Sequence, residues 1–277
     1  MTAVASFLQA RTNGGTWRIR IDDLDQQRCR DEHTTTILNQ LAGHGLEWDH
    51  PIYRQSAHLD DYRAALAEIS TQAHLYRCTC SRATLASTCR IGIDGPVYPG
   101  TCQRTEQGGK NGAIRIKLEQ KQLQLNDPWL GMISRDTTRD VGDFVLVRAD
   151  GTIGYQLACI VDELTLGVTE VVRGSDLVGS SVRQLHLLRD VLGRTAPRYC
   201  HIPVLTSADG RKLSKQNHAP AIDSAMASQN LTSCLRLLGQ LTPDDLQHQP
   251  VAETLRWALT HWDPARIPRQ TLLPSAA

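Results

Sequence analysis

Two lysines in the C-terminal part of the chain have the spacing of a phosphate clamp. Lys212 and Lys215 flank Ser214 in a polar segment that starts at Gly210. Their ammonium groups are compact charges, and Ser214 and the backbone N–H groups are donors. Together they could hold a triphosphate while its α-phosphorus is attacked. The alternative is an ordinary basic surface loop, because short basic strings recur by chance.

A second group of residues has the chemistry of a metal site. Cys78-Thr79-Cys80 and Tyr98-Pro99-Gly100-Thr101-Cys102 can bring three thiolates and a phenol together, and zinc takes four ligands in a tetrahedron. The expected role is structural, because a short Gly-rich segment has too little core to fold without a metal. Buried free thiols, or completion of the site by Cys89 or His74 in place of Tyr98, remain open.

Three further residues could bind a ligand, and two of them, Asp22 and Arg173, follow predicted strands, where α/β sheets bind ligands. Asp22 belongs to an acidic cluster that could hold a substrate ammonium, although such a cluster also suits a turn. Arg173 follows another strand and could hold a carboxylate with two hydrogen bonds, or form a surface ion pair. The hydroxyl of Tyr155 could contact a substrate or the edge of the core.

Apolar spacing predicts the elements that must position these residues. We expect helices at 2–11, 31–44, 62–74 and 181–192, strands at 17–21, 113–118, 144–147 and 168–172, a hairpin turn at 150–151, and helices beyond residue 221. Residues 76–112 are irregular and rich in Cys and Gly, which is typical of an insertion. Strands that alternate with helices predict an α/β fold with a parallel sheet, an insertion and a small helical C-terminal region.

Composition excludes several classes of protein. The 277 residues include 30 Lys and Arg against 29 Asp and Glu, so the net charge of +1 gives no global sign of nucleic-acid binding, and any such partner needs a local patch. No apolar run reaches the roughly 18 residues of a membrane span, and we expect no signal peptide. The eight cysteines do not form a secreted disulfide pattern, which favours a reducing cytoplasm.

Taken in order, these pieces resemble one family. The chain is similar to glutamyl-queuosine tRNA(Asp) synthetases, the short paralogues of glutamyl-tRNA synthetase among the class I aminoacyl-tRNA synthetases. The resemblance runs from about Thr2 into the 260s. The matching stretches are Arg18–Asp25, Gly45–Asp49, Gln55-Ser56, Cys78–Arg82, Tyr98–Cys102, Tyr155–Ala158 with Val161-Asp162, Gly167–Leu177 and Lys212–Pro220.

The resemblance implies a Rossmann-type catalytic domain that activates glutamate with ATP. Its first part would be 1–75 and its second part 113–220, with a zinc-binding insertion at 76–112 and a helical region at 221–277. Asp22, Tyr155 and Arg173 would bind glutamate. Lys212, Ser214 and Lys215 would bind ATP with Mg²⁺, the two lysines acting in catalysis. Cys78, Cys80, Tyr98 and Cys102 would hold a structural Zn²⁺. The acceptor would be the queuosine base of tRNA(Asp), and the protein a cytoplasmic monomer.

The sequence departs from the family pattern at two places. The family usually has glutamate where this chain has Asp22, so the carboxylate is one methylene shorter. The family's opening strand and its His-Ile-Gly-His-like signature are expected ahead of residues 2–11, and residues 1–20 do not supply them. We therefore expect an active enzyme whose start lies upstream, with the chain as written weakly active or inactive. The alternatives are a non-catalytic tRNA-binding relative and a truncated glutamyl-tRNA synthetase acting on tRNA(Glu).

RNA-contact residues are poorly specified by the sequence. Candidates are arginines near the predicted zinc segment and on the predicted helix at 181–192, and each could equally be solvated surface charge. They are Arg82, Arg90, Arg104, Arg183 and Arg189.

Overall fold

Helices and strands alternate along the computed structural model, which describes residues 1–25, 28–105, 111–206 and 222–274. The helices are α1 (Thr2–Thr12), α2 (Asp31–Gly43), α3 (Leu59–Gln72), α4 (Arg82–Thr88), α5 (Thr101–Thr105), α6 (Tyr155–Thr165), α7 (Val178–Leu185), α8 (Ala227–Leu237) and α9 (Val251–His261). The strands are β1 (Arg20–Ile21), β2 (Tyr53–Arg54), β3 (Leu75–Cys78), β4 (Arg90–Gly92), β5 (Gly95–Val97), β6 (Ala113–Ile116), β7 (Gln122–Asp127), β8 (Gly131–Asp136), β9 (Phe144–Val147), β10 (Glu170–Gly174), β11 (Arg198–Ile202), β12 (Val204–Thr206) and β13 (Leu272–Pro274).

Parallel strands occur among the described residues as separate pairs rather than as one continuous sheet. β1 pairs with β2, β10 with β11, and β12 with β13. Helices joined to parallel strands confirm the expected α/β class. The predicted strand at 17–21 pairs only over Arg20 and Ile21, because Trp17 and Ile19 instead accept isolated hydrogen bonds from the backbones of Asp49 and Tyr53.

Antiparallel strands build the other half of the molecule. β6 lies between β3 and β9, and a hairpin turn at 150–151 follows β9 as expected, with Val147 bridging to Ile153. β3 begins at Leu75 and so crosses the expected start of the insertion at residue 76. The β7–β8 hairpin was not predicted, although Leu123 and Leu125 alternate with exposed residues as a half-buried strand requires.

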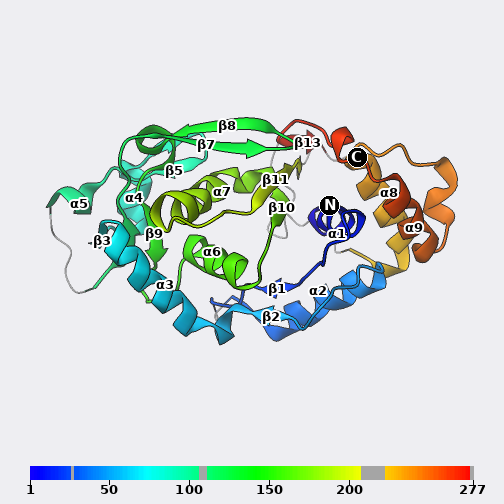
Figure 1. The fold of residues 1–277 in the computed structure, drawn as a ribbon, viewed down its shortest axis with the longest axis horizontal. Helices are drawn as coiled ribbons and strands as arrows, with labels where there is room; N and C mark the ends of the chain where they lie inside the picture. Colours follow the sequence, from blue (N-terminus) through cyan, green and yellow to red (C-terminus); the bar gives the residue numbers. More distant parts are fainter. Residues whose placement is uncertain (26–27, 106–110, 207–221, 275–277) are drawn as a thin grey trace.

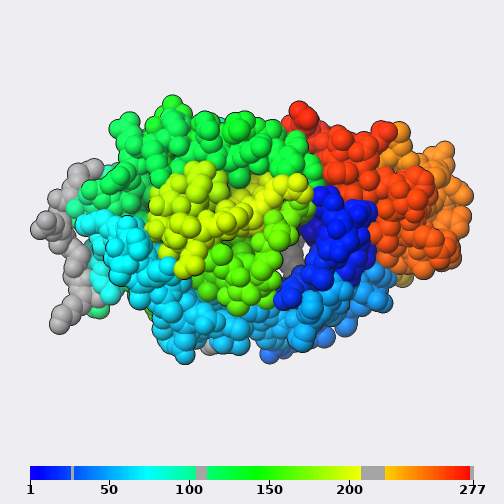
Figure 2. All heavy atoms as spheres, viewed as in Figure 1, coloured from blue at the N-terminus to red at the C-terminus, as the bar shows by residue number. Residues whose placement is uncertain are grey.

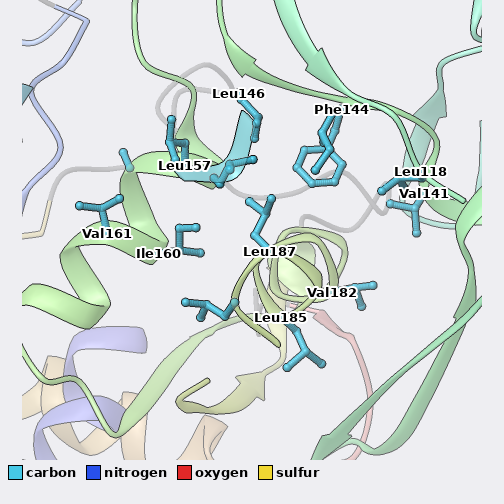
Figure 3. Close-up of a cluster of buried hydrophobic side chains, with 14 of the residues drawn as sticks. Leu118, Val141, Phe144, Leu146, Leu157, Ile160, Val161, Val182, Leu185 and Leu187 are labelled. Carbon is cyan, nitrogen blue, oxygen red and sulfur yellow. The ribbon is translucent and has the colours of Figure 1, made fainter. Parts of the chain in front are cut away.

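Helix α6 lies at the centre of the main core. Its residues 157–163 are all buried, and they pack with β9 and α7 (Figure 3). Leu157, Ile160, Leu187 and Leu146 are fully buried in this cluster. Burying each such side chain stabilises the fold by about 1.5–3 kcal/mol relative to exposure. The predicted helix at 181–192 starts earlier, at Val178, and ends in a π-helical turn over His186–Val191.

A second core joins the N-terminal helix to the C-terminal helices. Val4, Phe7 and Leu8 of α1 pack in one cluster with residues of α8 and α9, which lie at one end of the molecule (Figure 1). The indole of Trp262 donates to Gln9 at 3.0 Å. The predicted helix at 2–11 and the predicted helices beyond residue 221 are confirmed, and the structure shows that they pack against each other. Among the described residues, no helix is both long and apolar enough to cross a membrane.

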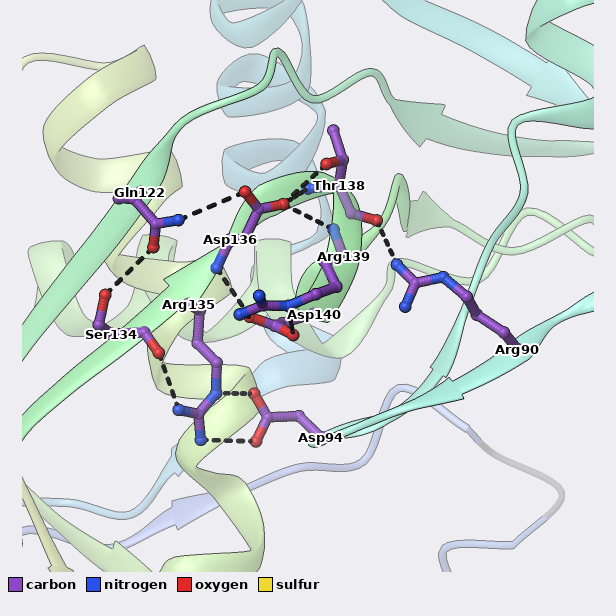
Figure 4. Close-up of polar contacts among 9 residues, drawn as sticks. All are labelled: Arg90, Asp94, Gln122, Ser134, Arg135, Asp136, Thr138, Arg139 and Asp140. Carbon is purple, nitrogen blue, oxygen red and sulfur yellow. Dashed lines mark hydrogen bonds and ion pairs between the residues drawn. The ribbon is translucent and has the colours of Figure 1, made fainter.

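The Cys-rich segment docks onto the β7–β8 hairpin through charged and polar contacts (Figure 4). Asp94, at the turn between β4 and β5, accepts two hydrogen bonds from Arg135 at 2.7 and 3.1 Å. Arg90 donates to the carbonyl of Thr138 at 2.8 Å. Both side chains of the Asp94–Arg135 pair are mostly buried, so the pair orients the segment more firmly than a surface ion pair would.

A buried polar relay connects β7, β11 and α7. One carboxylate oxygen of Asp127 contacts His201 Nδ1 at 2.6 Å, and His201 Nε2 contacts the hydroxyl of Ser181 at 2.7 Å. The other oxygen accepts from the backbones of Trp129 and Leu130. The Asp–His–Ser chain of contacts resembles a nucleophilic triad. Ser181 and His201 are 0% exposed, however, so no substrate can reach the hydroxyl of Ser181. The relay is structural.

We expect Asp127→Ala to lower the free energy of unfolding by about 3 kcal/mol or more, because the change leaves buried donors without their acceptor. Urea denaturation measures the loss. Asp150→Ala is the control, since that exposed carboxylate forms local turn hydrogen bonds with Thr152. A variant at Asp127 that unfolds within about 1 kcal/mol of the wild-type protein would contradict the structural role.

Candidate functional site

Two of the three predicted glutamate-binding residues line one cavity. Tyr155 begins α6, and Arg173 lies in β10, and both face a cavity of about 680 Å³ that Arg20 also lines. Figure 2 shows the hollow between the blue N-terminal segment and the green segment beside it. Gly154 allows the close turn before Tyr155, because a Cβ there would lie 2.9 Å from the carbonyl oxygen of Leu146.

Arg173 is held in a buried polar cage. Its guanidinium contacts Glu163 at 3.2 Å and Gln184 at 2.8 Å, and it lies 5.0 Å from the ring centroid of Tyr199. The hydroxyl of Tyr199 donates to the second oxygen of Glu163 at 3.1 Å. Arg173 is only 6% exposed. The surface ion pair considered as an alternative is therefore wrong, because the pairing is buried.

The charge at Glu163 is set by two opposing effects. Burial raises the pKa of its carboxyl above the ordinary value, whereas the positive charges of Arg173 and Arg20 lower it. The balance is a raised pKa. The guanidinium of Arg173 and the hydroxyl of Tyr199 nevertheless match an ionised carboxylate in number and geometry.

Asp22 lies beside the cavity, on Arg20, rather than among the residues that line it. Arg20 Nε donates to Asp22 at 2.6 Å, and the side chain of Asp22 is 42% exposed. The neighbouring acidic residues have structural partners. Asp23 accepts from the backbone and hydroxyl of Ser56, and Asp25 pairs with Arg28 and Arg148. Asp22 is thus the member of the cluster with the most accessible carboxylate beside the cavity.

Arg20 is itself positioned by a buried carboxylate. Asp162 is 0% exposed, lies 3.4 Å from Arg20 Nε, and accepts from Tyr62 and Gln55, each at 2.7 Å. Burial raises the pKa of Asp162, and the hydrogen bonds of Tyr62 and Gln55 oppose that effect. Cys159, 3.3 Å from Arg20, is also buried, which raises the pKa of its thiol to about 11 and keeps it protonated near neutral pH.

The four predicted zinc ligands come together in one cluster. The sulfur atoms of Cys78, Cys80 and Cys102 lie within 4.8 Å of one another. The phenol oxygen of Tyr98 lies 3.3 Å from the sulfur of Cys78 and 3.6 Å from that of Cys80, and it accepts from the backbone of Cys102 at 3.0 Å. Cys89 packs against the cluster without joining its group of sulfur atoms. The geometry favours Tyr98 as the fourth donor.

Hydrogen bonding gives this cluster an acidic thiol. Burial raises the pKa of Cys102, but hydrogen bonds from Tyr98, the backbone of Thr79 and the other two thiols outweigh it, and the pKa falls to about 6. Burial, together with hydrogen bonds to the neighbouring thiols, raises the pKa of Cys80 and that of Tyr98. A set of sulfur donors in which one thiol readily loses its proton near neutral pH suits a thiophilic cation such as zinc.

A larger cavity extends from this cluster to the start of α6. Its volume is about 1100 Å³, and Tyr155 lines both it and the smaller cavity. Arg82, Arg115, Arg148 and Arg183 contribute positive charge to its wall. Tyr155 therefore stands where a ligand of the smaller cavity and a ligand of the larger one would meet.

The arginines predicted as RNA contacts have different surroundings. Arg183 donates to the carbonyls of Gly179 and Val141, and burial lowers its pKa. Arg189 pairs with Asp190, and Arg90 donates to Thr138. Arg82 is exposed on the cavity wall. The side chain of Arg104 lies outside the described part of the structure, as do Lys212, Ser214 and Lys215 of the predicted ATP clamp.

Several residues with clear roles in this geometry were not singled out from the sequence. The side chains that lie at the smaller cavity or hold Arg173 in place there are those of Arg20, Glu163 and Gln184. At the cysteine cluster, Arg115 packs over the ring of Tyr98. One signal was available for Glu163, because an acidic residue at the end of an apolar helical run is buried only with a partner. The partner itself could not be read from the sequence.

Comparisons with known proteins place this chain within one enzyme family. The family described as "tRNA synthetases class I (E and Q), catalytic domain" matches residues 1–239. The "Glutamyl-Q tRNA(Asp) synthetase" of Chromobacterium violaceum is 43% identical over 268 residues, which cover 96% of this chain and 89% of that protein. The protein of the same name from Pseudomonas aeruginosa is 39% identical over 274 residues, which cover 99% and 91%.

Solved structures support the fold. The crystal structure of a glutamate tRNA ligase from Elizabethkingia meningosepticum, in complex with its amino acid, aligns with a TM-score of 0.74 at 22% identity. It matches all of this chain, which spans 63% of that longer protein. Glutamate-tRNA synthetase from Elizabethkingia anophelis gives the same TM-score at 21% identity, with 99% of this chain and 64% of the other covered. By sequence and by fold, this chain belongs to the class I tRNA synthetase catalytic-domain family, and within it to the glutamyl-Q tRNA(Asp) synthetases.

Proposed function

We propose that this protein activates L-glutamate with ATP and transfers the glutamyl group to the queuosine base of tRNA(Asp). The similarity to proteins named glutamyl-Q tRNA(Asp) synthetase, which extends over 96–99% of the chain, carries the proposal. The cavity lined by Tyr155 and Arg173 supports it, because a volume of about 680 Å³ is large enough for glutamate and its adenylate. Such a reaction takes place in the cytoplasm, where tRNA is found, and we propose a monomer.

Glutamate binding follows from the charges around the smaller cavity. Arg173 would hold a substrate carboxylate, Tyr155 would contact the bound amino acid, and Asp22 would receive the ammonium group. The shorter Asp22 carboxylate calls for a close approach or a bridging water. Arg20, fixed between Asp22 and Asp162, would keep that carboxylate at the cavity edge.

Activation requires no side-chain nucleophile. The α-carboxylate of glutamate attacks the α-phosphorus of ATP, and pyrophosphate leaves as glutamyl-adenylate forms. We propose that Lys212, Ser214 and Lys215 bind the triphosphate, and that the two lysines offset the charge that develops as pyrophosphate departs. Mg²⁺ would screen the same phosphates. The acceptor base would enter from the larger cavity and meet the adenylate near Tyr155, which lines both cavities.

Cys78, Cys80, Tyr98 and Cys102 would hold a structural Zn²⁺. The donors are close enough to share one ion, and they connect β3 to the loop and helix that carry Tyr98 and Cys102. The metal would stabilise a segment whose small hydrophobic cluster is built from Cys78, Tyr98 and Cys102, with partly buried neighbours such as Tyr76 and Leu85. We propose that this segment, residues 76–112, is an insertion between the two parts of the catalytic domain, at 1–75 and 113–220, with a helical region at 221–277.

The function is tested by glutamate-dependent ATP–pyrophosphate exchange and by transfer of labelled glutamate to three RNAs. These are tRNA(Asp) with queuosine, tRNA(Asp) without it, and tRNA(Glu). We expect exchange without any tRNA, and transfer only to queuosine-containing tRNA(Asp). Transfer to tRNA(Glu) would show the proposed acceptor to be wrong. Binding of tRNA without glutamate binding or exchange would favour the non-catalytic relative.

We expect Arg173→Lys to raise the KM for glutamate by about tenfold or more in the exchange assay. Lysine keeps a positive charge beside Glu163 but loses the planar fork that can hold a carboxylate with two hydrogen bonds, and one charge-assisted hydrogen bond is worth about 1.5–3 kcal/mol. The control is Arg194→Lys, because Arg194 forms an exposed ion pair with Glu68. An unchanged KM in the Arg173 variant would remove that residue from the glutamate site.

Purified protein should contain about one equivalent of zinc per chain, measured by elemental analysis. Cys102→Ser should lose most of the metal and lower the Tm, because it removes a buried sulfur donor from the proposed ligand set. Cys89→Ser is the matched control, since that cysteine packs against the cluster but lies outside the metal-binding group. Equal loss of zinc from the two variants would rule out the proposed ligand set.

A further inference from the structure

Arg115 of β6 lies directly beside the proposed metal site. Its guanidinium carbon lies 4.0 Å from the centroid of the Tyr98 ring, which is the stacking distance of a close cation–π contact. Arg115 is only 7% exposed. Its Nη1 donates to the backbone carbonyl of Asp143 at 2.8 Å, and this hydrogen bond fixes the guanidinium against the ring.

This buried cation has no ion-pair partner among the residues that the structure describes. Its Nε also has no hydrogen-bond partner in the same set. The carboxylate of Asp143 is occupied by other donors, the backbone of Leu118 at 2.8 Å and the hydroxyl of Tyr76 at 2.6 Å. A buried charge without a counter-charge is costly, so its presence needs an explanation.

The metal site supplies the counter-charge that Arg115 lacks. With three thiolates and one phenolate, a bound Zn²⁺ would leave the site with a net charge of −2. A permanent cation against the face of the phenol ring would reduce that excess and hold the ring in its ligating orientation. Groups behind the ligands commonly tune a metal site in this way.

We propose that Arg115 is a positioning residue of the metal site, one that orients Tyr98 and balances the charge of the donor set. The inference rests on the proposed zinc site, and it gives a role in metal binding to a residue that is not itself a ligand. It explains why β6, which supplies no ligand, carries a buried arginine beside the cluster. It also links the metal to the larger cavity, because Arg115 and Tyr98 both line its wall.

The test is the zinc affinity of the full chain, measured at fixed pH by competition with a chromogenic chelator. Arg115→Met keeps the packing of the side chain but removes the charge, and we expect it to weaken zinc binding by about tenfold or more. Arg115→Gln, which keeps a planar donor for the Asp143 carbonyl, should show a similar loss. Arg77→Met is the matched control, because Arg77 is exposed on β3 and donates to the carbonyl of Gly112.

A double-mutant cycle separates positioning from general stability. In a Tyr98→Phe background, which lacks the phenol oxygen, Arg115→Met should change zinc affinity far less than it does beside Tyr98. Cobalt(II) bound in place of zinc should show an altered visible spectrum in Arg115→Met. Unchanged affinity in both Arg115 variants, or an equal loss with and without the phenol, would overturn the role of Arg115 and leave the zinc site standing. A wild-type chain that binds no zinc would overturn the site and this inference together.

Discussion

The buried carboxylate of Asp162 is the interaction on which the arrangement of the smaller cavity depends. It accepts hydrogen bonds from Tyr62 on α3 and Gln55 after β2, and it lies close to Arg20 on β1. One ion therefore joins α6 to three other parts of the chain. Because an unpaired buried carboxylate would be very costly, these partners are held in place as firmly as the core itself.

Glu163, the next residue of α6, holds a second arginine in the same way on the other side of the cavity. Glu163 pairs with Arg173 on β10 and accepts from Tyr199 on β11, so α6 orients cationic groups from two of the three described parallel strand pairs, β1–β2 and β10–β11. The free-energy cost of burying these two adjacent carboxylates is offset by their hydrogen bonds and ion pairs. What results is a cavity whose arginines are fixed before any ligand arrives, and such preorganisation reduces the entropy lost on binding.

Much of the local structure was predictable from the sequence, because it rests on local spacing. The helices at 2–11, 31–44 and 62–74 follow from apolar residues repeated at helical intervals, and the structure has helices there. The β7–β8 hairpin was missed although its alternating leucines were visible. The ends of strands were harder to predict than the ends of helices, because the ends of β1 and β10 depend on which neighbouring strand supplies hydrogen bonds.

The sequence by itself determined the family, the α/β class and the residue types that suit the chemistry: an acidic cluster after a strand, an arginine at another strand, and four donors of zinc-binding type. Those properties are written in residue order and spacing. Tertiary structure alone decided that Arg173 would face Glu163, that Asp22 would lie on Arg20, and that Arg115 would cover Tyr98. These contacts join residues on different elements, and their formation depends on burial and packing that no local pattern encodes.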